Sequence, residues 1–216
     1  MRTPTPLLLA TLLAFLALPL RAQMAPSYGE DPQLRRVATD SLPALRQLVT
    51  SANAQAMGFR SPDEVGKAAL LPPIQIYLVR LDQLRQYQAG QEPAALLSGG
   101  DRVFFPLAVD GEVRSSVELD KSRGGWRTAG FGNPTLAKAL ASARDRIAPA
   151  PGSPAFAVHV AALNMYFVGK RDGGQLLLAA VIDDPRLKMT PGVPRPAAEV
   201  FSDLVPLAKQ YNGLPW

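Results

Sequence analysis

Cysteine is absent from this 216-residue chain, and histidine occurs once. Without cysteine the protein forms no disulfide bond, uses no thiol nucleophile, and binds neither zinc nor an iron–sulfur cluster through thiolates. It also lacks the acylated cysteine of a bacterial lipoprotein. A single histidine excludes metal sites built from several histidines, so we predict no metal site.

Charged residues are also scarce, at 19% of the chain, whereas hydrophobic residues make up 47%. In typical soluble domains about a quarter of the residues are charged. A chain of this composition buries enough apolar surface to offset the entropy that folding costs, which argues against intrinsic disorder. We therefore expect a folded core.

The first 22 residues have the pattern of a secretory signal peptide. Arg2 precedes an apolar run from Leu7 to Leu20 that Thr11 interrupts, and the small residue Ala22 ends the segment. This run is shorter than the roughly 20 residues that a transmembrane helix needs. We expect cleavage after Ala22 and no transmembrane helix in the mature chain.

Cleavage would remove Arg2 and Arg21 and thereby lower the formal net charge from +5 to +3. The remaining basic residues are spread along the chain, without the cluster that is typical of nucleic-acid-binding proteins. We predict a periplasmic or secreted protein that binds no nucleic acid. Its partner, an unidentified protein or small molecule, is expected in the cell envelope.

Two helices are expected early in the mature chain. Residues 23–38 are polar, contain prolines and show no clear period, which indicates a flexible segment, so the fold is expected to begin near residue 39. Apolar residues then recur every three or four positions, which predicts an amphipathic helix from residue 41 that ends before Gly58. The sequence Ser-Pro-Asp-Glu at 61–64 fits a capping box and predicts a second helix to about Leu70.

The clearest strand pattern runs from Val103 to Phe131. Apolar and polar residues alternate on both sides of Asp110-Gly111, a dipeptide typical of a type I′ hairpin turn, and a second reversal at 122–125 leads to a third strand. This pattern predicts an antiparallel meander with one apolar face. Pro106 cannot donate to the ladder, so we expect either an edge strand or a nitrogen that faces away from a neighbouring strand.

Further strands are predicted at 74–81, 156–162, 165–169 and 176–182, and helices after Asn133 and from about 197 to 211. Residues 148–153 are a possible internal linker, but the strands after it are too few to close a second core. We therefore predict a single α+β domain over residues 39–216, in which a largely antiparallel sheet, a meander plus a hairpin, packs against amphipathic helices. The strand at 176–182 is apolar on both faces, which predicts a place in the middle of the sheet.

No catalytic residue is predicted. His159 lies in a strand, opposite the face of Phe156, and no G-x-S-x-G motif supplies a serine, so a structural role is favoured. The paired glycines match no phosphate-binding motif, and no cofactor is predicted. Acidic pairs such as Glu118 and Asp120 lack calcium-loop spacing and are interpreted as solvated charge. A glycosidase-type carboxylate pair stays open, because such pairs are assembled in space.

Four residues form the predicted binding site: Arg114, Trp126, Arg127 and Tyr166. An aromatic ring flanked by cations holds an anionic or carbohydrate-like ligand, or a loop of a partner, through stacking and charge-assisted hydrogen bonds. The competing interpretation is that Trp126 covers the core, as an aromatic residue at the start of a strand ordinarily does.

These observations favour an exported, non-catalytic protein that binds a polypeptide or small ligand against its sheet or in a helix groove. Two alternatives stay open. An envelope or extracellular hydrolase, with a site assembled from carboxylates or serine, predicts a deep pocket with carboxylates of perturbed pKa. A chaperone-like assembly factor of the outer membrane predicts an exposed apolar patch of roughly several hundred Å².

Overall fold

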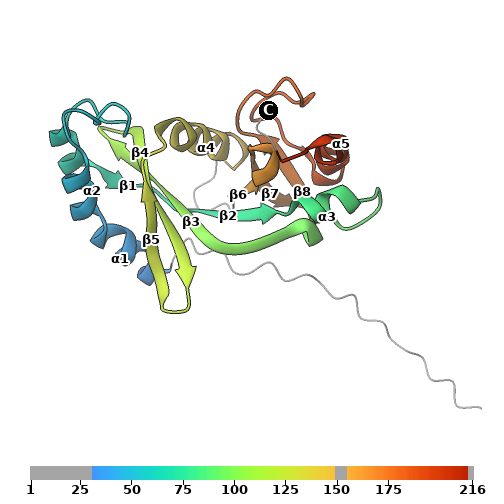
Figure 1. Cartoon of the computed structure of the whole chain (residues 1–216), viewed down its shortest axis with the longest axis horizontal. Helices are drawn as coiled ribbons and strands as arrows, with labels where there is room; N and C mark the ends of the chain where they lie inside the picture. The colour runs from blue at the N-terminus through green and yellow to red at the C-terminus, as the bar shows by residue number, and fades with distance from the viewer. Residues whose placement is uncertain (1–30, 149–154, 214–216) are drawn as a thin grey trace, which may run out of the picture.

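The computed structural model describes residues 31–148 and 155–213 (Figure 1). These residues form five α-helices and one sheet of nine strands that is mostly antiparallel, which confirms the predicted α+β class. The predicted signal peptide, the first part of the predicted flexible segment (23–30) and the predicted linker beyond Ala148 lie outside the described residues.

The strands lie in the spatial order β5-β4-β3-β2-β6-β7-β8-β9, and the short strand β1 pairs with β3 outside this path. Their bounds are β1 Ala69–Leu70, β2 Ile74–Val79, β3 Leu97–Val109, β4 Glu112–Ser122, β5 Gly125–Phe131, β6 Ala155–Val160, β7 Met165–Asp172, β8 Gln175–Ala180 and β9 Arg195–Pro196. Among these pairings β2 with β6 is parallel and the others are antiparallel. Two antiparallel groups are therefore joined through one parallel pair.

The β3–β4–β5 meander forms where the alternation predicts it. Asp110 and Gly111 have φ values of 51° and 81°, and both are positive, as a type I′ turn requires. Gly125, with φ 105°, ends the second reversal. Phe105 pairs with Val117 across the strands, and both side chains are fully buried on the apolar face.

Pro106 lies in β3, which has neighbours on both sides. The Pro106 carbonyl accepts a hydrogen bond from the amide of Leu71 at 2.9 Å. In an antiparallel ladder the nitrogen and oxygen of one residue point to the same side. The proline nitrogen therefore faces the segment after β1 and not β4, which is the second of the two predicted arrangements.

The first helix begins earlier than the sequence indicated. α1 spans Pro32–Asp40, and Leu34 and Ala38 on it are fully buried. Asp31 caps the helix by accepting a hydrogen bond from the amide of Gln33 at 2.9 Å. The prediction of a flexible segment is wrong over 32–38, because Pro32 occupies the first helical turn, where its missing N–H leaves no bond unmade.

α2 covers Leu42–Leu48 and does not extend toward Gly58 as predicted. The Asn53 side chain donates to the Leu48 carbonyl at 2.9 Å and accepts from the Thr50 amide at 2.7 Å. Such side-chain bonds to the backbone compete with continued helix. Turns therefore replace the rest of the predicted helix.

The predicted capping box at Ser61 is correct in part. Pro62–Lys67 forms a 3₁₀ helix instead of an α-helix, and the Ser61 side chain makes no capping hydrogen bond. The Glu64 carboxylate does reach back, but it accepts from the amide of Arg60 at 2.6 Å and not from Ser61. The segment then continues into β1.

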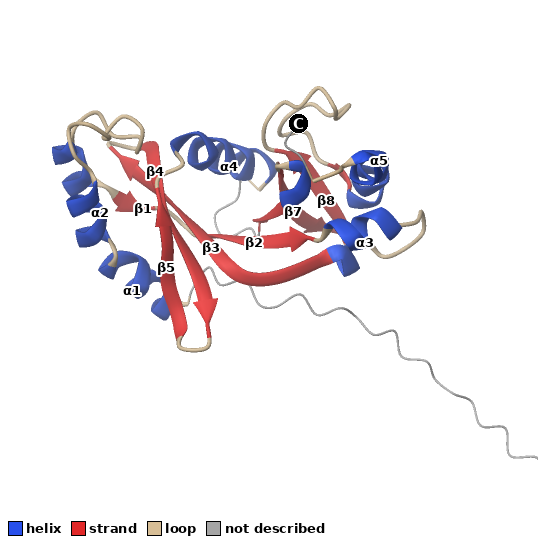
Figure 2. Cartoon of the chain, viewed as in Figure 1, coloured by secondary structure: helices blue, strands red, loops and turns tan. Residues whose placement is uncertain are grey.

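Helices cover both faces of the sheet (Figure 2). α1 and α2 pack over β3, β4 and β5, and α3 (Leu81–Gln86) and α5 (Ala197–Gln210) pack on the same face over β6, β7 and β8. α4 (Pro134–Ile147) lies on the opposite face, where its apolar cluster includes residues of β2, β3, β6, β7 and β8. No helix in the described ranges is long and apolar enough to cross a membrane.

β8 does not lie in the middle of the sheet, contrary to the prediction. Its outer neighbour is the two-residue strand β9, so β8 lies close to one end. Leu178 packs with α5, whereas the adjacent residue Ala179 packs with α4. Helices on both faces, and not a central position, account for the apolar composition of this strand.

Leu34→Ala tests whether α1 belongs to the fold. We expect a loss of about 2–5 kcal/mol in the free energy of unfolding, because a fully buried leucine leaves a cavity. The exposed neighbour Arg35 provides the control, and Arg35→Ala is expected to change stability by less than about 0.5 kcal/mol. Urea denaturation measures both, and equal stabilities of the two variants would contradict a packed α1.

Candidate functional site

A row of polar side chains flanks α4 on the face of the sheet that α4 covers. The strand residues that pack with α4 include Phe104 of β3, Ala157 of β6 and Val168 of β7. Residues two positions apart in a strand face the same side. Two positions farther along the same strands, and toward the same end of the sheet, lie Arg102, His159 and Tyr166. Glu118 and Asp120 lie beside Arg102 on the neighbouring strand β4. We call these five residues the polar strip.

Arg102 holds two carboxylates of the polar strip. Its Nε lies 3.4 Å from Oε1 of Glu118 and 3.3 Å from Oδ1 of Asp120. The cross-strand register explains this contact, because Arg102 is the partner of Asp120, and Glu118 stands two positions away on the same face. All three side chains are between 32% and 39% exposed, so the ion pairs are partly screened by solvent.

The Glu118 carboxyl lies in a different environment from an ordinary surface acid. Burial raises the pKa of Glu118, the neighbouring charge of Asp120 adds to this rise, and the charge of Arg102 opposes it. Desolvation therefore outweighs the attraction of the guanidinium. Glu118 is therefore partly desolvated and is not the fully solvated charge that the sequence interpretation assumed, although its side chain is still 34% exposed.

His159 and Tyr166 form a stacked pair at the other end of the polar strip. The two residues are direct partners across β6 and β7. Their ring centroids lie 4.0 Å apart, and the ring planes are nearly parallel, at 7°. Burial raises the pKa of the Tyr166 hydroxyl, the charge of Glu118 adds to this rise, and the charge of Arg102 opposes it.

The His159 ring is neutral at physiological pH. Burial, and after it the positive charge of Arg102, lower the pKa of His159 to about 4. Its Nδ1 atom is buried and has no hydrogen-bond partner in the described part of the chain. An unpaired buried polar atom costs about 1–3 kcal/mol of stability.

Two serines on the same face are already engaged by backbone carbonyls. The Ser98 hydroxyl of β3 donates to the carbonyl of Leu78 at 2.9 Å. The buried Ser116 hydroxyl of β4 donates to the carbonyl of Gly132. Neither hydroxyl is bonded to His159, so these serines do not form a nucleophile–base pair with it.

The structure separates the four residues of the predicted binding site. Tyr166 belongs to the polar strip. Arg127 is exposed on β5 and is the cross-strand partner of Asp120, so it lies at the opposite end of the strip. Trp126 faces the other side of the sheet, where it packs against the α1–α2 cluster. Arg114 lies at the bulge near the start of β4, where it pairs with Glu112.

Sequence reasoning missed the association of Arg102 with His159. Alternation in β6 does place His159 opposite Phe156, and the same argument applied to β3 places Arg102 opposite Val103. No local pattern indicates that β2 and β6 pair, however. This pairing alone places β3, which carries Arg102, and β6, which carries His159, on either side of β2. The partial burial of Glu118 likewise has no signal in the sequence.

Three shallow hollows lie away from the polar strip. One of about 710 Å³ lies beside α3, and its lining includes Gln83, Gln86, Gln88 and Gln91. Two others, of about 350 Å³ and 590 Å³, meet at Lys138 on α4. None of these three includes a residue of the strip, and each is open to solvent.

Within the described ranges, no group of three or more histidine, aspartate or glutamate side chains is arranged to hold a metal ion. Comparison with known proteins adds no further information: no protein-family model, curated protein or solved structure matches the chain significantly. The chemistry of the polar strip therefore has to be argued from its own geometry.

The low pKa of His159 predicts a specific loss of stability in acid. The unfolded chain takes up a proton near pH 6.5, whereas the folded ring does so near pH 4, so protonation favours unfolding as the pH falls through this window. After allowance for the exposed part of the ring, we expect about 2 kcal/mol. His159→Gln lacks this contribution, so urea denaturation of both proteins from pH 7 to pH 4 should give diverging stabilities. Parallel curves would contradict a buried neutral imidazole.

Proposed function

We propose that this protein is an exported, non-catalytic binding protein that holds a polar ligand or an extended polypeptide against the polar strip. The observation that carries the proposal is the combination of the Arg102 carboxylate cluster with the stacked pair His159–Tyr166, on one sheet face beside α4. Titratable groups perturbed by burial and by one another are typical of functional sites.

The strip offers hydrogen-bonding groups of several kinds. A neutral imidazole has one donor and one acceptor nitrogen, a phenol donates and accepts, and carboxylates accept. All of these groups stand on strands and not on loops, so they are held in place before a ligand arrives.

Several contacts favour binding over catalysis. The two carboxylates share the Arg102 guanidinium, and the serines on the same face bond to carbonyls. A nucleophile needs a base within hydrogen-bond reach, and His159 has no such partner among the described residues. The strip thus has recognition groups without an activated nucleophile.

The hydrolase alternative is favoured by one observation, the raised pKa of Glu118 beside Asp120. Two carboxyls in different environments are the usual arrangement of an acid and a base in glycoside hydrolysis. Glu118→Gln distinguishes the two functions. A hydrolase would lose at least about 100-fold in rate on an oligosaccharide substrate, whereas a binding protein shows no turnover before or after the change.

The chaperone-like alternative receives little support from the described surface. The large apolar side chains that are exposed there are Leu48, Ile182 and Val193. Leu48 lies on α2, whereas Ile182 and Val193 lie within the loop between β8 and β9. Such dispersed residues do not form one continuous patch of the size that unfolded clients require.

Chemical-shift mapping by NMR tests the binding proposal. The isotope-labelled protein is titrated with neutral oligosaccharides, acidic oligosaccharides and short extended peptides. We expect one of these classes to shift the amide signals of β3, β4, β6 and β7 around Arg102, His159 and Tyr166. Arg102→Gln and His159→Gln should each weaken that ligand about tenfold, because each removes one hydrogen-bonding group.

Lys209→Gln is the matched control, because Lys209 is exposed on α5, which packs on the face of the sheet opposite the strip. It is expected to leave the affinity unchanged. Shifts that gather instead at the glutamine-lined hollow beside α3, or affinities that neither strip variant alters, would refute a ligand site on the polar strip.

A further inference from the structure

We propose that the tip of the β4–β5 hairpin binds an anionic lipid surface. The hairpin extends beyond its neighbour β3, away from the body of the described molecule (Figure 1). Residues 121–127 contain three basic residues, Lys121, Arg123 and Arg127, and no acidic residue. The proposal does not rest on the function proposed for the polar strip, although Arg127 is the cross-strand partner of Asp120 in that strip.

The three cations are exposed and lie on different sides of the hairpin. Lys121 stands on the face toward α1, with its Nζ 5.8 Å from the centroid of the Trp126 ring. Arg127 stands on the opposite face, as the partner of Asp120. Arg123 lies in the turn between them. Neither arginine forms an ion pair with another described residue.

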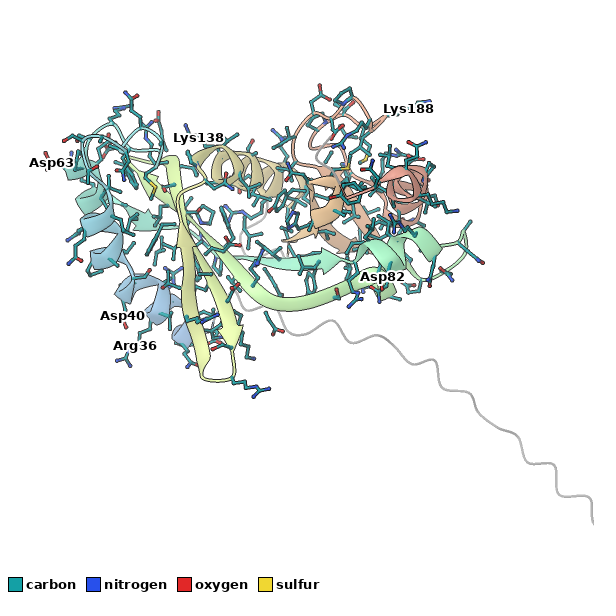
Figure 3. All side chains as sticks on the ribbon, viewed as in Figure 1. Arg36, Asp40, Asp63, Asp82, Lys138 and Lys188 are labelled. Carbon is teal, nitrogen blue, oxygen red and sulfur yellow. The ribbon has the colours of Figure 1, made fainter. Side chains whose placement is uncertain are left out.

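The neighbouring helix does not cancel this charge. The start of α1 lies beside the turn, since Gln33 Nε2 is 3.9 Å from the position of a Cβ built on Gly125. Residues 31–40 contain two arginines and two aspartates and are therefore neutral overall. The Arg36 side chain pairs with Asp40 at 3.7 Å, and both point to solvent (Figure 3).

The arrangement fits a surface of many phosphates better than one anion or one protein. Cations on opposite faces and at the tip do not converge on a point, as the side chains of a single-phosphate site would. A stable protein interface needs a buried apolar centre, and residues 122–125 are two glycines, a serine and an arginine. Electrostatic attraction to anionic headgroups requires only that several cations approach together.

Vesicle sedimentation tests the proposal with the protein and two kinds of vesicle, phosphatidylglycerol mixed with phosphatidylcholine, and phosphatidylcholine alone. We expect binding to the anionic vesicles only, and its loss in about 1 M salt, where the screening length falls to about 3 Å. Neutralising the hairpin by K121Q, R123Q and R127Q together should lower the partition coefficient about 100-fold, or about fivefold for each cation.

A second variant with the same net charge separates the hairpin from the charge of the whole protein. Lys138, Lys188 and Lys209 are exposed, and the first two lie at the end of the molecule opposite the hairpin tip (Figure 3). The triple change K138Q, K188Q and K209Q should lower binding by less than about fivefold. Thermal unfolding of both triple variants checks that each is folded.

Energy transfer provides a local measurement. Trp126 and Trp216 are the two tryptophans of the chain. In a Trp216→Phe background, excited Trp126 should transfer energy to a dansyl-labelled anionic lipid, and the hairpin changes should abolish the transfer. Three results would overturn the proposal. The two triple variants could lose vesicle binding equally, the protein could fail to bind anionic vesicles at low salt, or the hairpin could bind duplex DNA in preference to vesicles.

Discussion

The parallel pairing of β2 with β6 is the interaction on which the rest of the structure depends. It joins the antiparallel group that contains the meander to the antiparallel group that contains the last hairpin. Ile76 meets Ala157 under α4, and the Tyr77 ring meets Phe156 edge-on at 5.2 Å on the other face. Without this pair the two groups would expose the edges of central strands, which are ready templates for pairing with other chains.

The same pairing creates the polar strip. Leu78 of β2 is the partner of His159 on one side and of Ser98 of β3 on the other. His159 therefore stands one strand away from β3, close enough for the charge of Arg102 to lower its pKa. α4 covers the adjoining row of apolar residues, and its presence makes the neighbourhood of His159 and Glu118 less polar than open solvent.

Helix coverage also explains how two different surfaces arise on one sheet. Where helices lie on both faces, the strands are apolar throughout, as in β8. Where α4 ends, the strands β3, β4, β6 and β7 carry the polar side chains of the strip. At the β4–β5 tip, residues 121–127 carry basic but no acidic side chains. The polar strip is built for directional hydrogen bonds, whereas the hairpin tip is suited to diffuse electrostatic attraction.

Much of the secondary structure followed from local patterns. Alternation and the Asp110-Gly111 turn predicted the meander, and Asn133 predicted the start of α4, where its side chain accepts from the amide of Leu136. The errors came from local competition. Asn53 ended α2 through its own hydrogen bonds, and Pro32 began a helix in a segment whose composition indicated flexibility.

The sequence by itself determined the α+β class, the hairpin turns and the faces on which single residues such as His159 lie, because these depend on neighbours a few positions away. Only the tertiary structure decided that β8 lies near one end of the sheet and that Arg102, Glu118 and His159 share one face. Strand order and burial depend on contacts between distant segments. A local pattern is the same whichever partner its strand finally meets, and so it carries no record of that choice.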